Sequence, residues 1–196
     1  MASFKLSVAV AICAAIFVVI LAIAAYFDPT IRVLHVFEAV PYAVAGVLCL
    51  RRNKVGYMLA AVSGGFWLWM AGFRTSFIRN GFERVAMLAR TGTVDRVDIL
   101  IAAPAALATG GLVLFSLFGY LRLPDKSWRD ILTLLAASVL VPVFFIAIFW
   151  AFAPRYLGLF HGILKLSPRA RARGLEGRRG EKWAGASRRP PFQATH

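Results

Sequence analysis

The sequence predicts an all-α fold: a polytopic transmembrane helix bundle followed by a disordered, basic C-terminal tail. Of the 196 residues, 60% are hydrophobic and 16% are charged, and the mean hydropathy is +0.70. Soluble domains usually contain about 45–50% apolar and about 25% charged residues. The charged residues also fall in short clusters between long uncharged runs. Such runs are typical of helices that cross a lipid bilayer.

Four uncharged runs are long enough to cross a membrane, because roughly 20 apolar residues in a helix span about 30 Å of hydrocarbon. Helices are expected because lipid offers no partners to unpaired backbone groups. These runs predict spans at about 6–27, 55–73, 99–121 and 131–153. The first run exceeds the apolar core of about 7–15 residues that signal peptides carry, so we interpret it as a retained helix.

A fifth candidate span, at about 31–50, is interrupted by two ionisable residues, His35 and Glu38. Asp28 followed by Pro29 nevertheless favours a helix start, since Asp caps helix N-termini and proline fits the first turn. We therefore predict five spans in a bundle over residues 1–157. The alternative has four spans, with this segment as a re-entrant or interfacial piece.

The distribution of Lys and Arg predicts the orientation of the chain in the membrane. With five spans, seven of the 23 Lys and Arg residues flank one side and sixteen flank the other, which includes the C-terminal tail. Short loops rich in these residues stay in the cytoplasm. We expect a cytoplasmic C-terminus in both span models, and a bacterial inner membrane as the location. The N-terminus lies outside with five spans and inside with four.

The segment at about 75–91 has the pattern of an amphipathic helix. Its apolar residues share one arc at 100° per residue, whereas Arg79 and Arg90 lie on the opposite face. Gly92 then offers a left-handed C-terminal stop. We expect this helix to lie in the membrane interface, with both arginines in contact with lipid headgroups. The alternative is a short helix packed against its own bundle.

The tail at 158–196 is rich in Arg, Gly, Ala and Pro and nearly lacks aliphatic residues beyond its start. Such a segment cannot bury enough surface to fold alone. Arg169, Arg171 and Arg173 are expected to contact anionic headgroups, at about 1 kcal/mol of attraction each. Membrane lipid accounts best for the net charge of +14. Nucleic acid is not an expected partner, because no nucleic-acid-binding fold or aromatic platform accompanies the charge.

The strongest candidate for a polar site inside the membrane is His35 with Glu38 and Pro41. The first two are three residues apart and share a helical face. A proline at position 41 leaves the carbonyl of Phe37 without its helical N–H partner. Ionisable groups at membrane depth are costly and usually serve relays, ion sites or helix contacts. The alternatives are an interfacial position near water or a buried carboxyl that joins two helices.

Small residues at four-residue spacing predict close helix packing. Ala60 and Gly64 form one such pair, and Ala102, Ala106 and Gly110 form a stripe in the next span. Backbones approach closely where such stripes meet. The stripes are expected to serve contacts within the bundle or with other membrane protein subunits.

No metal or cofactor is expected. The two cysteines, Cys13 and Cys49, lie in apolar runs, and the three histidines have no ligand spacing. The scarcity of paired acids and bases in the spans argues against an enzyme. The sequence therefore favours a non-catalytic accessory or scaffold subunit of a membrane complex. The alternative is a small transporter or proton-coupled carrier that uses Glu38 and His35.

Overall fold

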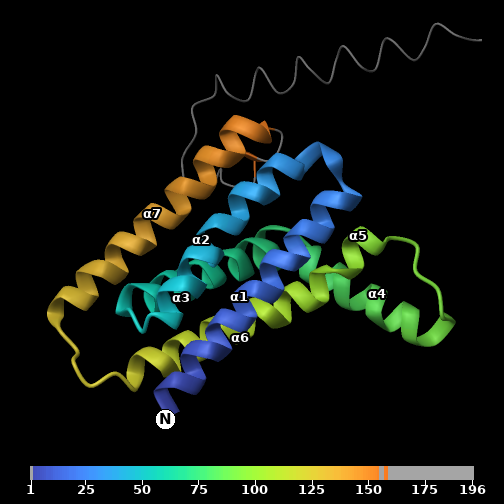
Figure 1. The fold of residues 1–196 in the computed structure, drawn as a ribbon. Helices are drawn as coiled ribbons and strands as arrows, with labels where there is room; N and C mark the ends of the chain where they lie inside the picture. The colour runs from blue at the N-terminus through green and yellow to red at the C-terminus, as the bar shows by residue number, and fades with distance from the viewer. Residues whose placement is uncertain (1, 155–156, 159–196) are drawn as a thin grey trace, which may run out of the picture. The chain divides into compact units, whose positions relative to one another are not determined.

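A computed structural model of the chain describes residues 2–154 and 157–158, and every regular element in this part is helical (Figure 1). The helices are α1 Ala2–Phe27, α2 Arg32–Leu50, α3 Lys54–Trp69, α4 Phe77–Thr91, α5 Val97–Leu100, α6 Ala102–Leu121 and α7 Trp128–Phe152. Five helical stretches of the described residues are long and apolar enough to cross a membrane. The predicted all-α bundle with five such helices is confirmed.

The turn between α1 and α2 favours the five-span prediction over the four-span alternative. Asp28 accepts a hydrogen bond on its Oδ1 from the backbone N–H of Thr30 at 3.0 Å, and a 3-10 turn at Pro29–Ile31 leads directly into α2. The stretch Pro29–Leu50 is therefore helical throughout and long enough to span. The segment thus has the helical length and composition that the five-span prediction requires.

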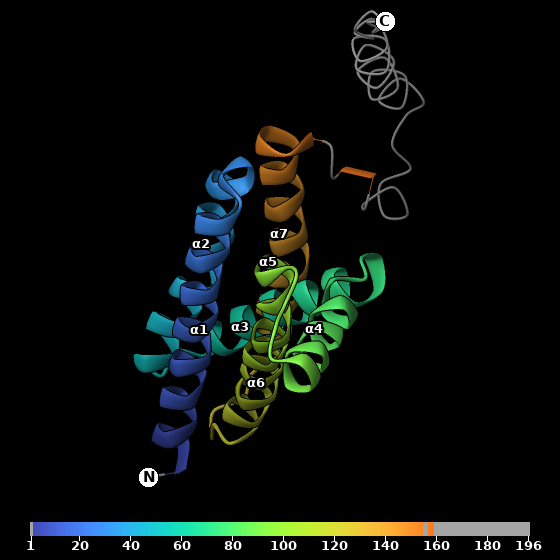
Figure 2. The ribbon, with the colours of Figure 1, turned by 90° about the vertical axis from the view of Figure 1, so that its right-hand side faces the viewer.

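Successive long helices alternate in direction, so their ends gather at two ends of the bundle (Figures 1 and 2). One end contains the start of α1 and the α2–α3 turn, because Ser7 Oγ lies 2.5 Å from the hydroxyl of the buried Tyr57. The α6–α7 loop lies at the same end, where Lys54 Nζ is 3.4 Å from Asp130 Oδ2. The other end contains the α1–α2 turn, α5 and the C-terminal end of α7.

Helix α3 packs closely against α6 through a glycine. Ala60 and Gly64 are both buried in α3, and a Cβ at position 64 would lie 2.9 Å from Val113 Cγ2 and 3.3 Å from the carbonyl of Thr109. Only a residue without a side chain permits this approach. The predicted pair therefore lies at a helix–helix contact within the bundle.

The predicted stripe on α6 is only partly in contact with the bundle. Ala102 is buried, but Ala106 is half-buried, and a Cβ at Gly110 would meet nothing within 4 Å. Gly110 makes no close contact within the bundle, because strict four-residue spacing rotates about 40° per step around a helix with 3.6 residues per turn. A contact of Gly110 with another subunit stays a prediction. The buried face instead alternates three- and four-residue steps. It comprises Ala102, Ala105, Thr109, Leu112, Ser116 and Gly119.

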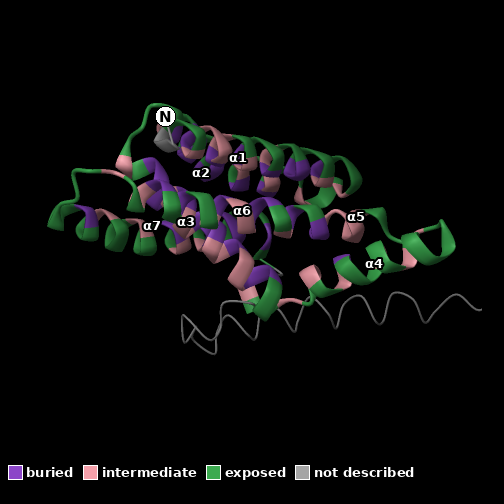
Figure 3. Ribbon diagram, turned by 90° about the horizontal axis from the view of Figure 1, so that it is seen from below, coloured by how far each residue is buried: buried purple, intermediate pink, exposed green. Residues whose placement is uncertain are grey.

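Helix α4 coincides with the predicted amphipathic segment. It is capped by Gly92, whose φ of 70° is the left-handed stop. It packs against its own bundle through Gly81, where a Cβ would lie 2.7 Å from Ala102 Cβ and 2.9 Å from the backbone nitrogen of Ala103. A separate apolar strip of the same helix, with Phe82, Val85 and Leu88, is exposed, and Figure 3 shows α4 with many exposed residues in green. The helix is thus both docked and amphipathic.

Helix α7 begins at a capping box. The Ser127 side chain accepts a hydrogen bond from a backbone N–H in the first turn of the helix. The Asp130 side chain in turn accepts one from the backbone N–H of Ser127. Only 17% of its span window is buried within the bundle, against 33% to 50% for the other four spans. The remaining surface of α7 is apolar and open to lipid or to another apolar partner.

Candidate functional site

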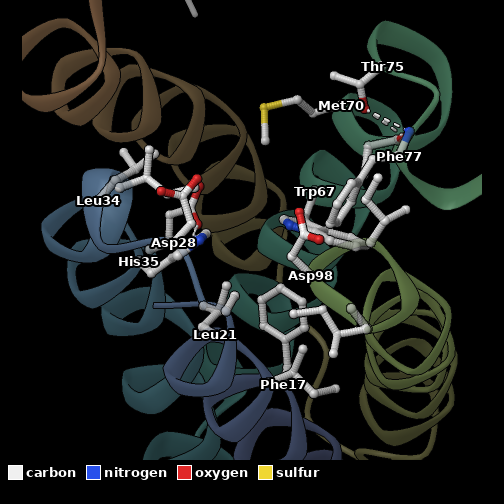
Figure 4. A pocket seen from close by; sticks show the side chains of 18 of the residues that line it. Phe17, Leu21, Asp28, Leu34, His35, Trp67, Met70, Thr75, Phe77 and Asp98 are labelled. Atoms are coloured by element: carbon white, nitrogen blue, oxygen red, sulfur yellow. Dashed lines mark hydrogen bonds and ion pairs between the residues drawn. The ribbon is translucent and has the colours of Figure 1, made fainter. Parts of the chain in front are cut away.

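A cavity of about 370 Å³ lies at the end of the bundle that contains the α1–α2 turn and α5 (Figure 4). It is bounded by the last turns of α1, the first turns of α2, the end of α3, the α5–α6 junction and the end of α7. This volume is within the range of roughly 300–1,000 Å³ that small-molecule sites occupy. The helices therefore form a partly open cavity of ligand size.

The inner wall of the cavity is aromatic and aliphatic. Phe17 is fully buried, and its ring meets the ring of Trp67 edge-on at a centroid distance of 5.1 Å. Leu21, Met70 and Phe149 complete this inner wall, and Figure 4 shows Phe17, Leu21 and Trp67 around the same space. Apolar walls of this kind favour the hydrophobic body of a ligand.

His35 and Glu38 lie side by side on the α2 wall of the cavity. His35 Nδ1 is 2.8 Å from Glu38 Oε2, and the side chains are 14% and 5% exposed. The helical spacing of three residues places them together, as the sequence predicts. A carboxyl this deeply buried must be paired or protonated, because an isolated buried charge is strongly unfavourable. The pair is therefore a titratable unit on a cavity wall.

Pro41 is buried one turn after Glu38 inside α2, outside the set of described residues that line the cavity. The next residue, Tyr42, is fully buried and donates its hydroxyl hydrogen to the carbonyl of Ser63 at 3.0 Å. Tyr42 also stacks obliquely against Phe17, with centroids 4.4 Å apart. This contact fixes α2 against α1 and α3 and so holds the wall that carries Glu38.

A second ion pair lines the cavity from the α5 side. Arg96 donates two hydrogen bonds to Asp98, with Nε–Oδ1 at 2.9 Å and Nη2–Oδ2 at 2.5 Å. The Asp98 hydrogen bond and charge raise the pKa of Arg96 above its usual value, so this guanidinium stays charged. Figure 4 shows the Asp98 carboxylate across the cavity from His35. Sequence reasoning missed this pair, since these residues precede the predicted span at 99–121.

After α3 comes a π-helical turn at Met70–Arg74, which extends one residue beyond the predicted 55–73 span. Its backbone closes with a hydrogen bond from the Thr75 N–H to the carbonyl of Met70 at 3.1 Å. The wider turn brings Met70, Ala71 and Thr75 to the cavity. Isolated π-turns occur mostly at functional sites in helices. The run of apolar residues contained no signal for this irregularity.

A separate polar cluster joins three helices at the opposite end of the bundle. Asp130 Oδ2 accepts a hydrogen bond from Tyr120 at 3.1 Å, from the backbone N–H of Ser127 at 2.9 Å and from Lys54 at 3.4 Å. One carboxylate thus joins the start of α3, the end of α6 and the start of α7. This arrangement is a structural clamp, and sequence reasoning did not identify it.

The structure describes two of the five arginines that are predicted to contact lipid headgroups. The Arg79 side chain is 84% exposed on α4, with Nε 3.0 Å from Glu83 Oε1, and Arg90 is also exposed. Arg169, Arg171 and Arg173 lie outside the described residues. In the described part, no three His, Cys, Asp or Glu side chains are grouped so that they could hold a metal ion.

Comparison with protein-family models, with curated proteins and with solved structures found no match to this chain. The fold and the site define its class. It is a helical protein with five helices apolar enough to cross a membrane, and it encloses a cavity lined by aromatic residues and two ion pairs.

Proposed function

We propose that this protein is a small, proton-coupled membrane carrier that binds its solute in the cavity and uses Glu38 and His35. The observation that supports the proposal is the position of this titratable pair, buried on a cavity wall inside a span. Ionisable groups at this depth are costly and usually functional. Carboxyl and imidazole groups within spans commonly form the proton relays of transporters.

The chemistry of the proposed cycle needs only these two side chains and water. The pair has a deprotonated state, with a neutral imidazole and a carboxylate. Its protonated state holds one more proton, either on the imidazole as imidazolium or on the carboxyl as carboxylic acid. A solute that interacts with Glu38 binds these states unequally. Solute binding and proton binding are therefore linked, and linkage of this kind is reciprocal.

Accessibility of the cavity tests the proposal. In a chain whose native cysteines are replaced by alanine, Leu21→Cys places a thiol on the cavity wall and Leu114→Cys places one on the lipid-facing surface, where Leu114 is 56% exposed. A water-soluble thiol reagent added to each side of a membrane vesicle should label position 21 from both sides and position 114 from neither. Labelling of position 21 from one side alone would contradict a carrier.

We further propose that the protein lies in a bacterial inner membrane with its C-terminus in the cytoplasm. The support is the excess of Lys and Arg on the side of α4 and the tail, sixteen against seven. A topology reporter fused after His196 should read cytoplasmic, and one fused before Met1 should read outside. A periplasmic reading after His196 would overturn the orientation.

Anionic lipid headgroups are the proposed partners of Arg79 and Arg90. Both arginines are exposed on α4, beside the exposed apolar strip that includes Phe82. A helix with this distribution lies in the interface plane with its apolar side toward the acyl chains. Charge reversal at both arginines should weaken binding of anionic lipid in native mass spectrometry, and equal binding by the variant would refute the assignment.

A non-catalytic accessory or scaffold subunit of a membrane complex is the second candidate function, and the outer face of α7 favours it. This helix buries the smallest share of its span window, and Leu135, Val139 and Val143 are exposed along one side. A protein that co-purifies in mild detergent at fixed stoichiometry, and is lost after Val139→Trp, would support this function. A monodisperse single protein would favour the carrier.

A further inference from the structure

We infer that the cavity binds a hydrophobic organic monocation, whose apolar body lies among the aromatic side chains and whose charge faces Glu38. The ligand class is that of amines and quaternary ammonium compounds. This inference rests on the proposed carrier function, because it names the solute of the same site. It follows from the charge balance around Glu38, the aromatic inner wall and the volume of the cavity.

The cationic side chains near the cavity already have partners other than Glu38. Arg96 donates two hydrogen bonds to Asp98 on the α5 side. Arg74, in the π-turn, lies over the Trp69 ring at 5.8 Å from its centroid. Arg32, at the start of α2, directs its Nε to the carbonyl of Ala25 at 3.2 Å. None of these contacts places a guanidinium against Glu38.

Among the described residues that line the cavity, those on the other helices add no further positive charge to the wall around Glu38. Phe149 is the residue by which α7 lines the cavity, and α1 contributes apolar side chains up to Asp28, which is itself an acid bonded to Thr30. Within the described lining, the remaining basic side chain is His35, and it is charged only when protonated. With neutral His35, an ionised Glu38 therefore lacks a positive partner, and a ligand cation supplies it.

The aromatic wall distinguishes an organic cation from an inorganic one. Trp67 and Phe17 meet edge to face beside the cavity, and aromatic rings attract cations that lie over their faces, Trp most strongly. Hydrated metal ions instead need several oxygen ligands, whereas most of this wall is carbon. A monocation with an apolar body satisfies both the carboxylate and the rings.

Protons compete with the cation at the same pair. Binding of a monocation to the protonated pair releases one proton to water, and the carboxylate of Glu38 then faces the ligand with neutral His35 beside it. At low pH, either His35 is charged and occupies Glu38, or Glu38 itself is neutral. Both forms bind the cation more weakly, so the affinity for the cation rises with pH.

Binding of three probes of similar shape to the purified full-length protein tests the inference. The probes are benzyltrimethylammonium, the neutral alcohol 2-methyl-1-phenylpropan-2-ol and the anion phenylmethanesulfonate. Isothermal titration calorimetry is run at about pH 8 and about pH 5, on either side of the usual histidine pKa of about 6.5. At the higher pH the cation should bind at least about tenfold tighter than the alcohol, which is about 1.4 kcal/mol. The preference should shrink at the lower pH.

Two variants test whether Glu38 causes the preference for the cation over the alcohol. Glu38→Gln should reduce the cation affinity to that of the alcohol while the alcohol affinity is retained, and Glu83→Gln, an exposed carboxylate on α4, should behave as wild type. If Glu38→Gln does not fold, the pH dependence of the wild-type preference still decides the question. Equal binding of cation and alcohol, or tighter binding of the sulfonate, overturns the cation inference and leaves a ligand-binding carrier. Binding of none of the probes overturns the inference and the carrier function together.

Discussion

Replacement of Gly119 by alanine should destabilise the bundle, whereas replacement of Gly110 on the same helix should not. A Cβ at position 119 would overlap the ring of Tyr57, with Cδ1 at 2.9 Å, but a Cβ at position 110 would meet nothing within 4 Å. The Tyr57 ring is fully buried, and its hydroxyl is held by Ser7 at 2.5 Å, so it cannot move aside without losing a hydrogen bond. The clash must therefore shift α6 away from α3.

The expected difference between the two variants follows from three effects. Overpacking of a core costs about 1–3 kcal/mol, and loss of a buried hydrogen bond adds about 0.5–1.5 kcal/mol. Alanine in place of glycine within a helix contributes about 0.5–1 kcal/mol of stability in both variants, so this effect cancels in the comparison. Gly119→Ala should therefore be less stable than Gly110→Ala by about 1.5–4.5 kcal/mol.

Thermal unfolding in detergent measures this difference. Cys49 is buried in α2, so its reaction with a thiol-reactive dye reports opening of the bundle. For a chain of this size each kcal/mol shifts the melting temperature by about 2–4 °C. Gly119→Ala should melt below wild type, and Gly110→Ala at or above it. If Gly119→Ala melts as high as Gly110→Ala, the close contact between α6 and Tyr57 does not exist in solution.

Three further predictions concern other parts of the chain. Asp130→Ala should lower the melting temperature more than Asp125→Ala, because Asp130 links the start of α7 to Lys54 at the start of α3 and to Tyr120 at the end of α6. Equal melting temperatures of the two variants would show that the clamp contributes nothing to stability. Gly81→Leu should detach α4 from α6 and increase protease cleavage between them, since a side chain there meets Ala102 within 3 Å; unchanged cleavage would contradict the docking of α4. Deletion of residues 168–196 should leave a chain that inserts and purifies, and loss of the folded protein would show that the tail packs against the bundle.

The positions of the long helices could be predicted from the sequence, because the signal for each is local. A span is recognised from the apolar character of about 20 consecutive residues, and this signal does not depend on the rest of the chain. The same holds for the helix start at Asp28 and the stop at Gly92, where a side-chain hydrogen bond and a positive φ are properties of single residues. The adjacency of His35 and Glu38 likewise follows from helical spacing.

The site beyond that pair could not be predicted, because it depends on which helices meet. Arg96 and Asp98 reach the cavity only because α5 lies opposite α2, although about 60 residues separate them in the sequence. Asp130 reads in the sequence as an ordinary capping residue, and only the approach of α3 and α6 makes it a clamp. Only the structure shows that Gly110 lies outside the packed face of α6, since every side of such a helix is apolar and the pattern does not distinguish lipid from protein. Hydrophobicity therefore identified the helices that are apolar enough to cross a membrane, whereas their mutual packing decided which polar groups share a cavity.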